Sequence, residues 1–149
     1  MLMTRATKTD PKVAVLRDCF GFSGRRERDL QALAMLFDEV RIEPGERLIR
    51  ESESGRELFL IVAGQVAVTV RDQPVGTLGP GEFVGEMSLF ERALRSATVT
   101  ALTRVEALVA GTHGFATLLN DAAVLRRLAT TLARRLRTSQ GSPTGWPAA

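Results

Sequence analysis

The sequence is poor in the side chains from which catalytic and metal sites are usually assembled. Its 149 residues include one cysteine, one histidine and no tyrosine. The common pairs of nucleophile and base cannot be built from this set, and no Cys/His cluster has metal-ligand spacing. Neither G-x-G-x-x-G nor G-x-x-x-x-G-K-[ST] occurs in the chain. The sequence therefore predicts a protein that is not an enzyme and holds neither a metal nor a cofactor.

Long apolar runs and paired cysteines are missing as well. The single Cys19 excludes an internal disulfide, and no apolar stretch approaches the ~20 residues of a membrane-spanning helix. The N-terminal residues contain no apolar segment of the kind found in signal peptides. We therefore expect a cytoplasmic protein with no membrane span. Hydrophobic residues make up 44% and charged residues 25%, as in an average globular domain, and the length fits a single one.

The hydrophobic pattern changes its period twice along the chain. Helical spacing runs over 11–37, a period of two runs over 40–112, and helical spacing returns over 113–138. Many short strands separated by turn residues are typical of a closed or rolled antiparallel sheet. The predicted fold is therefore α+β, a jelly-roll-like antiparallel β-roll of about eight strands flanked by N-terminal and C-terminal helices. Residues 1–10 and 139–149 have the composition of a disordered N-terminus and a flexible tail.

Individual strands and turns follow from the same pattern. The segment Leu58–Val62 is apolar at every position, which predicts a strand buried on both faces, whereas Val66, Val68 and Val70 alternate with polar or small residues. Four short segments have turn composition: Glu43-Pro-Gly-Glu, Ala63-Gly-Gln, Asp72-Gln-Pro and Gly79-Pro-Gly.

The last helix is predicted to begin after Asp121, a good N-cap residue. Its apolar residues form one stripe: Leu125, Leu128, Ala129, Leu132 and Leu136. It also carries many arginines, for which a solvated helix face is the favoured interpretation. Binding to nucleic acid or to an anionic membrane surface is the less favoured interpretation, and the lack of an aromatic stacking platform weakens the case for single-stranded nucleic acid. Pairing with a partner protein or a second copy of the chain stays open.

The stretch from Gly79 to Ala101 holds the residues best suited to bind an anion. Gly85 lets the backbone approach a ligand, and a single helical turn over Met87–Glu91 would offer free N–H groups at its N-terminus, where Met87 and Ser88 lie. The guanidinium of Arg95 can donate to two phosphate oxygens at once, and the small side chains of Ser96 and Ala97 leave nearby N–H groups free to bind an oxygen of the anion. Glu86, a pure acceptor when ionised, suits a sugar hydroxyl.

These residues resemble a known family. Phe83-x-Gly-Glu-x-x-Leu followed by Arg95-Ser-Ala is similar to the phosphate-binding cassette of cyclic-nucleotide-binding domains, found in regulatory subunits of cyclic-AMP-dependent kinase, nucleotide-gated channels and the bacterial catabolite activator. Three further segments resemble other parts of that roll: Pro44-Gly-Glu, Gly55–Gly64 and Leu78-Gly-Pro-Gly. The similarity spans roughly 30–136.

The resemblance implies a sensor for cyclic AMP, with cyclic GMP as the alternative ligand. Glu86 would bind the ribose 2′-hydroxyl, and Arg95 the exocyclic phosphate oxygens, assisted by the backbone around Ser96 and Ala97. A residue of the last helix between Leu128 and Arg135 would cap the base and close over it. The family usually has a Gly-Asp turn where this chain has Ser52-Glu-Ser-Gly55; we expect this departure to alter a turn and to leave the pocket alone.

Two other interpretations compete with this one. Glu86 and Arg95 would form a loop salt bridge with each other if the segment had only a structural role. Alternatively, the roll would have lost its ligand and would act as a protein-interaction or dimerisation module, because no output domain follows the last helix. The expected partners are thus a cyclic nucleotide and, beyond it, an effector protein or a second copy of the chain.

Overall fold

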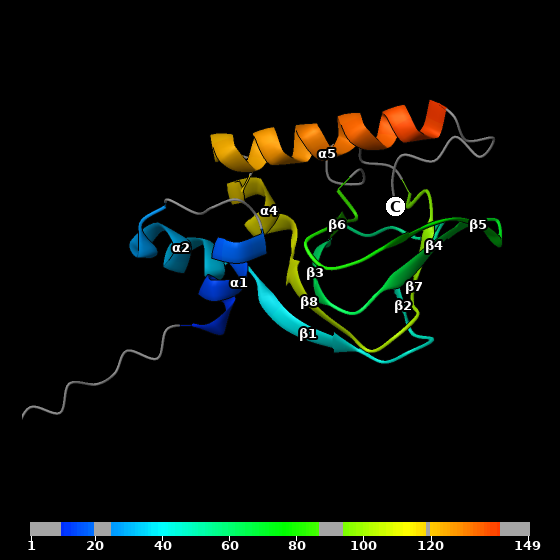
Figure 1. Cartoon of the computed structure of the whole chain (residues 1–149), viewed down its shortest axis with the longest axis horizontal. Helices are drawn as coiled ribbons and strands as arrows, with labels where there is room; N and C mark the ends of the chain where they lie inside the picture. The colour runs from blue at the N-terminus through cyan, green and yellow to red at the C-terminus, as the bar shows by residue number, and fades with distance from the viewer. Residues whose placement is uncertain (1–9, 20–24, 87–93, 119, 141–149) are drawn as a thin grey trace, which may run out of the picture.

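The computed structural model describes residues 10–19, 25–86, 94–118 and 120–140. Within these ranges the chain forms two helices, then eight strands, then two more helices, as the period changes predicted. Figure 1 shows the strands gathered into a roll, with α1 and α2 at one end of it and α5 lying across β6. The antiparallel β-roll flanked by terminal helices is therefore confirmed.

The helices differ from their predicted limits by a few residues. Helices α1 (Pro11–Cys19) and α2 (Glu27–Ala34) lie in the predicted helical region, but the first strand already begins at Asp38. Helix α4 (Thr112–Leu118) is short, and α5 (Ala122–Gln140) continues two residues beyond 138, into the segment predicted to be a flexible tail. No helix of the described residues has the length and hydropathy that crossing a bilayer requires.

Two four-stranded antiparallel sheets make up the roll. The first has the order β1-β8-β3-β6 and the second β2-β7-β4-β5. The strand limits are β1 Asp38–Ile42, β2 Arg47–Ile49, β3 Leu58–Ala63, β4 Val66–Val70, β5 Gln73–Leu78, β6 Phe83–Val84, β7 Thr98–Ala101 and β8 Val105–Ala110. Strands β6 and β7 enclose the predicted cassette and belong to different sheets, so the cassette crosses from one layer to the other.

Three of the four predicted turns lie where the composition placed them. Gly45, Gly64 and Gly81 adopt positive φ angles of 87°, 90° and 86° between strands. The fourth turn lies one residue earlier than expected: Val70 pairs with Gln73, so Arg71 and Asp72 form the two-residue loop. Both have positive φ, 50° and 63°, as the tight hairpin turn with matching twist requires.

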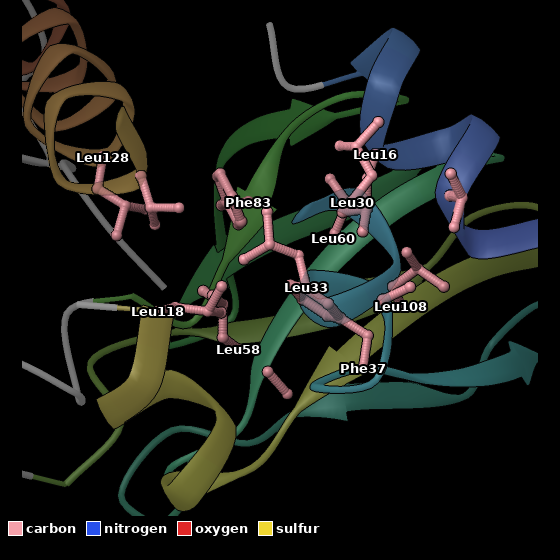
Figure 2. Packing of buried hydrophobic residues seen from close by; sticks show 14 residues of the cluster. Leu16, Leu30, Leu33, Phe37, Leu58, Leu60, Phe83, Leu108, Leu118 and Leu128 are labelled. Carbon is pink, nitrogen blue, oxygen red and sulfur yellow. The ribbon is translucent and has the colours of Figure 1, made fainter. Parts of the chain in front are cut away.

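Strand β3 is shared by two hydrophobic clusters. Its Leu58 and Leu60 face the helices, whereas Phe59 and Ile61 face the interior of the roll. Figure 2 shows the first cluster, where Leu16, Leu30 and Leu128 from three helices converge on β3, β6 and β8. The predicted burial of both faces of this strand is confirmed over Leu58–Ile61.

Helix α5 buries a different face from the predicted one. Val124 and Leu128 are buried against the first cluster, but Leu125 and Leu136 are 39% and 52% exposed. The predicted stripe is therefore only partly right: Leu128 is buried and Leu132 half-buried, whereas the buried face is centred on Val124 and Leu128 and leaves Leu125 and Leu136 exposed. The predicted cap is confirmed: Asp121 Oδ1 accepts bonds from the N–H groups of Ala123 and Val124, at 2.9 and 3.1 Å.

Candidate functional site

The cassette begins where β6 ends and closes where β7 starts. Gly85 follows β6 with φ +96°, a conformation that side chains rarely adopt, and turns the chain so that Glu86 points inward. On the other side, Arg95 and Ala97 are buried just before β7, and Ser96 between them is exposed. The two ends meet directly, because the guanidinium of Arg95 reaches the backbone of Gly85.

Arg95 is buried and bound by main-chain carbonyls. Its Nη1 donates to the carbonyl oxygen of Gly85 at 3.0 Å, and its Nη2 donates to that of Glu57 at 2.9 Å. Only 6% of the residue is exposed, and burial lowers its pKa from the usual value. The two carbonyls satisfy N–H groups of the guanidinium, and the negative charges of Glu57 and Glu86 raise its pKa against the effect of burial.

Two glycines make room for this guanidinium. A Cβ at Gly55 would lie 2.9 Å from Arg95 Nε, and a Cβ at Gly85 would lie 2.7 Å from Nη1. Side chains at these positions would have to displace Arg95 or the backbone. The expectation that the turn Ser52–Gly55 leaves the pocket alone is therefore wrong, because this loop contacts the predicted phosphate-binding residue.

Glu86 is fully buried and pairs with the last helix. Its Oε1 accepts from Arg135 Nη1, and Arg135 Nη2 donates to the carbonyl oxygen of Phe83 at 2.5 Å. Its other oxygen, Oε2, is buried without a hydrogen-bond partner among the described residues. Burial raises the pKa of Glu86, while the positive charges of Arg135 and Arg95 act in the opposite direction. The interpretation as a simple Glu86–Arg95 salt bridge does not hold, since the carboxylate pairs with Arg135 instead.

The predicted site is thus partly assembled in the structure. Gly85, Glu86, Arg95 and Ala97 lie together, whereas Met87 and Ser88, with the helical turn expected over Met87–Glu91, lie outside the described residues. Ser96 lies beside Arg95 and is exposed.

Arg135 is the residue of this site that sequence reasoning missed. It stood at the end of the range suggested for a base cap and among the arginines assigned to a solvated face. A signal for its burial was present, because Val124, Leu128 and Arg135 recur at spacings of four and seven on one helix face. An arginine on the buried face of a helix needs an acidic partner, and the cassette supplies it in Glu86.

These features define a β-roll binding module in which a buried arginine and a buried carboxylate converge from the two ends of one loop. A sequence profile described as "Cyclic nucleotide-binding domain" matches residues 39–122, more than half of the chain. The chain belongs to this family, as the cassette residues indicated.

Curated relatives and solved structures agree with this assignment. The chain is 33% identical over 135 residues to the acetyltransferase Pat of Mycolicibacterium smegmatis, covering 88% of this chain and 40% of that protein. It is 38% identical over 98 residues to a cAMP-dependent protein kinase regulatory subunit of Yarrowia lipolytica, covering 64% of this chain and 26% of that protein. A solved cAMP-binding acyltransferase from Mycobacterium smegmatis superimposes with a TM-score of 0.72 at 32% identity, over 90% of this chain and 43% of the other. The chain therefore spans less than half the length of these relatives.

Proposed function

We propose that this chain is a regulatory module that binds a cyclic nucleotide between Arg95 and Glu86. Arg95 contributes its guanidinium to the exocyclic phosphate oxygens, together with the backbone N–H groups around Ser96 and Ala97. Glu86 accepts a hydrogen bond from the ribose 2′-hydroxyl. Met87 and Ser88 complete the proposed site from the segment that follows Glu86.

The observation that carries this proposal is the state of the Glu86 carboxylate. A buried polar atom without a partner costs roughly 1–3 kcal/mol, more when the group is charged, so such atoms are rare in native proteins. Glu86 Oε2 is one of them, and it belongs to a residue that is 0% exposed next to the buried Arg95. A ligand hydroxyl would satisfy this oxygen, and the anion of the same ligand would lie against the guanidinium of Arg95. A cyclic nucleotide carries both groups.

Cyclic AMP is the ligand we favour. The regulatory subunit of a cAMP-dependent kinase and the cAMP-binding acyltransferase are among the proteins that this chain resembles, at 38% and 32% identity. Cyclic GMP is the second candidate, because the hydroxyl of Ser96 is suited to meet the guanine amino group.

Helix α5 is the element through which binding would be transmitted. Its Arg135 contacts Glu86, so a ligand that engages this carboxylate changes the free energy of the helix contact. A ligand shifts a conformational equilibrium only if it binds the two states with different affinity. We infer that the closed position of α5, in which Arg135 holds Glu86, is the state that the nucleotide favours. The proposal includes an effector protein that responds to this position of α5.

Calorimetric titration of the purified chain with cyclic AMP, cyclic GMP and 5′-AMP tests the proposal. We expect saturable binding of a cyclic nucleotide, with cyclic AMP the tighter, and at least about tenfold weaker binding of 5′-AMP, since the acyclic phosphate presents a different shape and charge to Arg95. Absence of heat with both cyclic nucleotides, on a folded and nucleotide-free sample, would overturn it.

A ligandless interaction module is the second candidate function, and the exposed face of α5 favours it. Leu125 and Leu136 are 39% and 52% exposed there, and Leu132, partly exposed, lies between them at spacings of seven and four. Such a seam is typical of helices that pair with another helix. Size-exclusion chromatography with light scattering separates the alternatives: a dimer formed without nucleotide supports this function, and a monomer at all concentrations contradicts it.

A further inference from the structure

The loop between β2 and β3 is paired with the backbone of Arg95. The N–H of Ser52 donates to the carbonyl oxygen of Arg95, and the N–H of Arg95 donates to that of Glu53, both at 2.9 Å. Ser52 adopts a φ angle of 68°, which is uncommon for a residue with a side chain and allows this pair of hydrogen bonds. The loop therefore holds Arg95 on its backbone as well as at its guanidinium.

Glu51, the residue before this pairing, anchors the loop to β7. Its N–H donates to Thr98 Oγ1, and the same hydroxyl donates back to Glu51 Oε1, each at 3.1 Å. Thr98 is buried and is the first residue of β7, directly after Ala97. The reciprocal bonds thus fix the end of the cassette that enters the sheet.

The same carboxylate also reaches the β4–β5 turn. The N–H of Arg71 donates to Glu51 Oε1 at 3.2 Å and to Oε2 at 3.1 Å. Arg71 is the first residue of the two-residue loop between Val70 and Gln73, so its N–H lies outside the ladder of the hairpin. One N–H is shared between both oxygens of the carboxylate, so Glu51 links this turn to the β2–β3 loop.

We propose that Glu51 is a positioning residue for the phosphate site. One carboxylate joins the β2–β3 loop, the start of β7 and the β4–β5 turn, and the loop it anchors holds Arg95 through Ser52 and Glu53. The guanidinium of Arg95 and the N–H groups of Ser96 and Ala97 are thereby kept in one arrangement before the anion arrives. Preorganisation of this kind raises affinity by removing the cost of ordering the groups on binding. This inference rests on the proposed function, because the ligand it serves is the cyclic phosphate.

Glu51→Gln and Glu51→Ala test this role, with Glu39→Gln as the matched control. Glu39 is an exposed residue of β1, in the other sheet, so its replacement makes the same charge change away from the cassette. We expect cyclic AMP affinity to fall about tenfold in Glu51→Gln, because this variant loses the charge of the hydrogen-bonded carboxylate. We expect a larger fall in Glu51→Ala. The control should bind as the wild type does.

A readout specific to the phosphate separates positioning from general loosening. Cyclic AMP with sulfur in place of one or the other exocyclic oxygen gives two diastereomers, and a preorganised Arg95 discriminates between them. We expect this discrimination to shrink in the Glu51 variants, and the amides of Arg71, Ser52 and Arg95 to exchange faster in the ligand-free protein.

The outcomes distinguish this inference from the proposed function. A wild-type chain that binds no cyclic nucleotide overturns the proposed function, and with it the ligand part of this inference. A wild-type chain that binds, with Glu51 variants of unchanged affinity and discrimination, overturns only the role of Glu51. Weaker binding with undiminished discrimination also overturns it, since that result describes a lost structural contact and no effect on the phosphate.

Discussion

At the scale of single residues, the site is made of two charges taken out of water within one loop. Burying a charge is costly unless it is paired and hydrogen-bonded. Arg95 donates to two carbonyl oxygens and lies within the field of Glu57 and Glu86, and one oxygen of Glu86 pairs with Arg135. The other oxygen of Glu86, Oε2, has no partner among the described residues, and a buried carboxylate oxygen left in this state lowers stability. A residue arrangement that is costly in the fold and chemically suited to a ligand is the expected signature of a binding site.

Arg135→Gln is predicted to change how ligand affinity depends on pH. Burial raises the pKa of Glu86, and the guanidinium of Arg135 opposes this shift, with a smaller contribution from Arg95. Removing Arg135 therefore raises the pKa of Glu86 further. Since the carboxylate must be ionised to accept from the ribose, affinity should begin to fall at a higher pH in the variant as the solution is acidified. Titrations of wild type and variant with cyclic AMP at a series of pH values, from neutral downward, measure this.

The exposed Arg126 supplies the control for this experiment. It lies on the same helix, so Arg126→Gln removes one positive charge without touching Glu86. Identical pH profiles for wild type and Arg135→Gln would show that the ion pair does not tune the carboxylate.

Sequence reasoning named the residues of the proposed site that lie close together in the chain and missed the one that lies far away. Gly85, Glu86 and Arg95 could be predicted because they lie within one loop, where short sequence spacing already brings their chemical groups together. Arg135 follows Glu86 by 49 positions, and its contact exists only because α5 packs across β6. The role of the Ser52–Gly55 loop was misjudged for the same reason: pairing between distant backbone segments leaves no local pattern.

At the scale of elements, the start of α5 is the point where the last helix is tied to the N-terminal helices. Asp121 caps the helix with Oδ1, and both of its carboxylate oxygens also accept from Arg25, at 2.5 and 2.6 Å. Arg25 precedes α2, so one side chain ties the N-terminal helices to the C-terminal one. The hydrogen bond from Arg25 lowers the pKa of Asp121.

Two replacements of Asp121 should separate the contribution of the helix cap to stability from that of the ion pair with Arg25. Asp121→Ala removes both and is expected to lower the free energy of unfolding by about 1–2 kcal/mol at neutral pH, the usual effect of losing an N-cap. Asp121→Asn keeps a good capping residue and removes only the charge. Because the pKa of Asp121 is lowered in the folded protein, its charge contributes stability above its ordinary pKa, near 4, and loses it as the pH falls through the folded value.

Urea unfolding of the three proteins at neutral pH and at about pH 3 measures both effects. The free energy of unfolding of the wild type should fall on acidification. The fall should be smaller in Asp121→Asn. An Asp121→Ala variant as stable as the wild type at neutral pH would mean that the cap contributes nothing.

The buried face of α5 shows where element prediction fails. Leu125, Leu132 and Leu136 form a regular apolar pattern, and Val124 with Leu128 form another. Both patterns have helical period, so periodicity alone cannot say which one packs on the roll. The tertiary partner decides, and the first cluster accepts Val124 and Leu128. The eight strands were easier to predict, because a period of two with turn residues at short intervals is a local property.

At the scale of the whole molecule, β3 is shared by two cores, which predicts that both unfold as one cooperative structure. Its alternate side chains contribute to the helical cluster and to the interior of the roll, and it lies between β8 and β6 in its sheet. Loss of packing on either face of this strand should therefore weaken the whole fold, including the pairing of β3 with Phe83 and Val84, the first residues of the cassette.

Leu60→Ala is predicted to destabilise both layers together. Leu60 is fully buried in the helical cluster, and a leucine-to-alanine change in a core costs about 2–5 kcal/mol. Hydrogen exchange of amides in β1 and in β4, from different sheets, should accelerate by a similar factor. Leu102, 51% exposed, provides the control, since Leu102→Ala is expected to stay within about 0.5 kcal/mol of wild type. Acceleration confined to one sheet would contradict a single cooperative unit.

The central claim, that Glu86 and Arg95 hold a cyclic nucleotide together, is tested most directly by titrating cyclic AMP and its 2′-deoxy analogue into wild type and Glu86→Gln. We predict wild-type binding of cyclic AMP around micromolar or tighter, roughly −8 kcal/mol. Removing the 2′-hydroxyl should weaken binding to the wild type markedly and binding to Glu86→Gln much less, because the variant has already lost the carboxylate that accepts from this hydroxyl. An equal loss in both proteins would contradict the contact with Glu86, and no binding of cyclic AMP by the folded wild type would contradict the account as a whole.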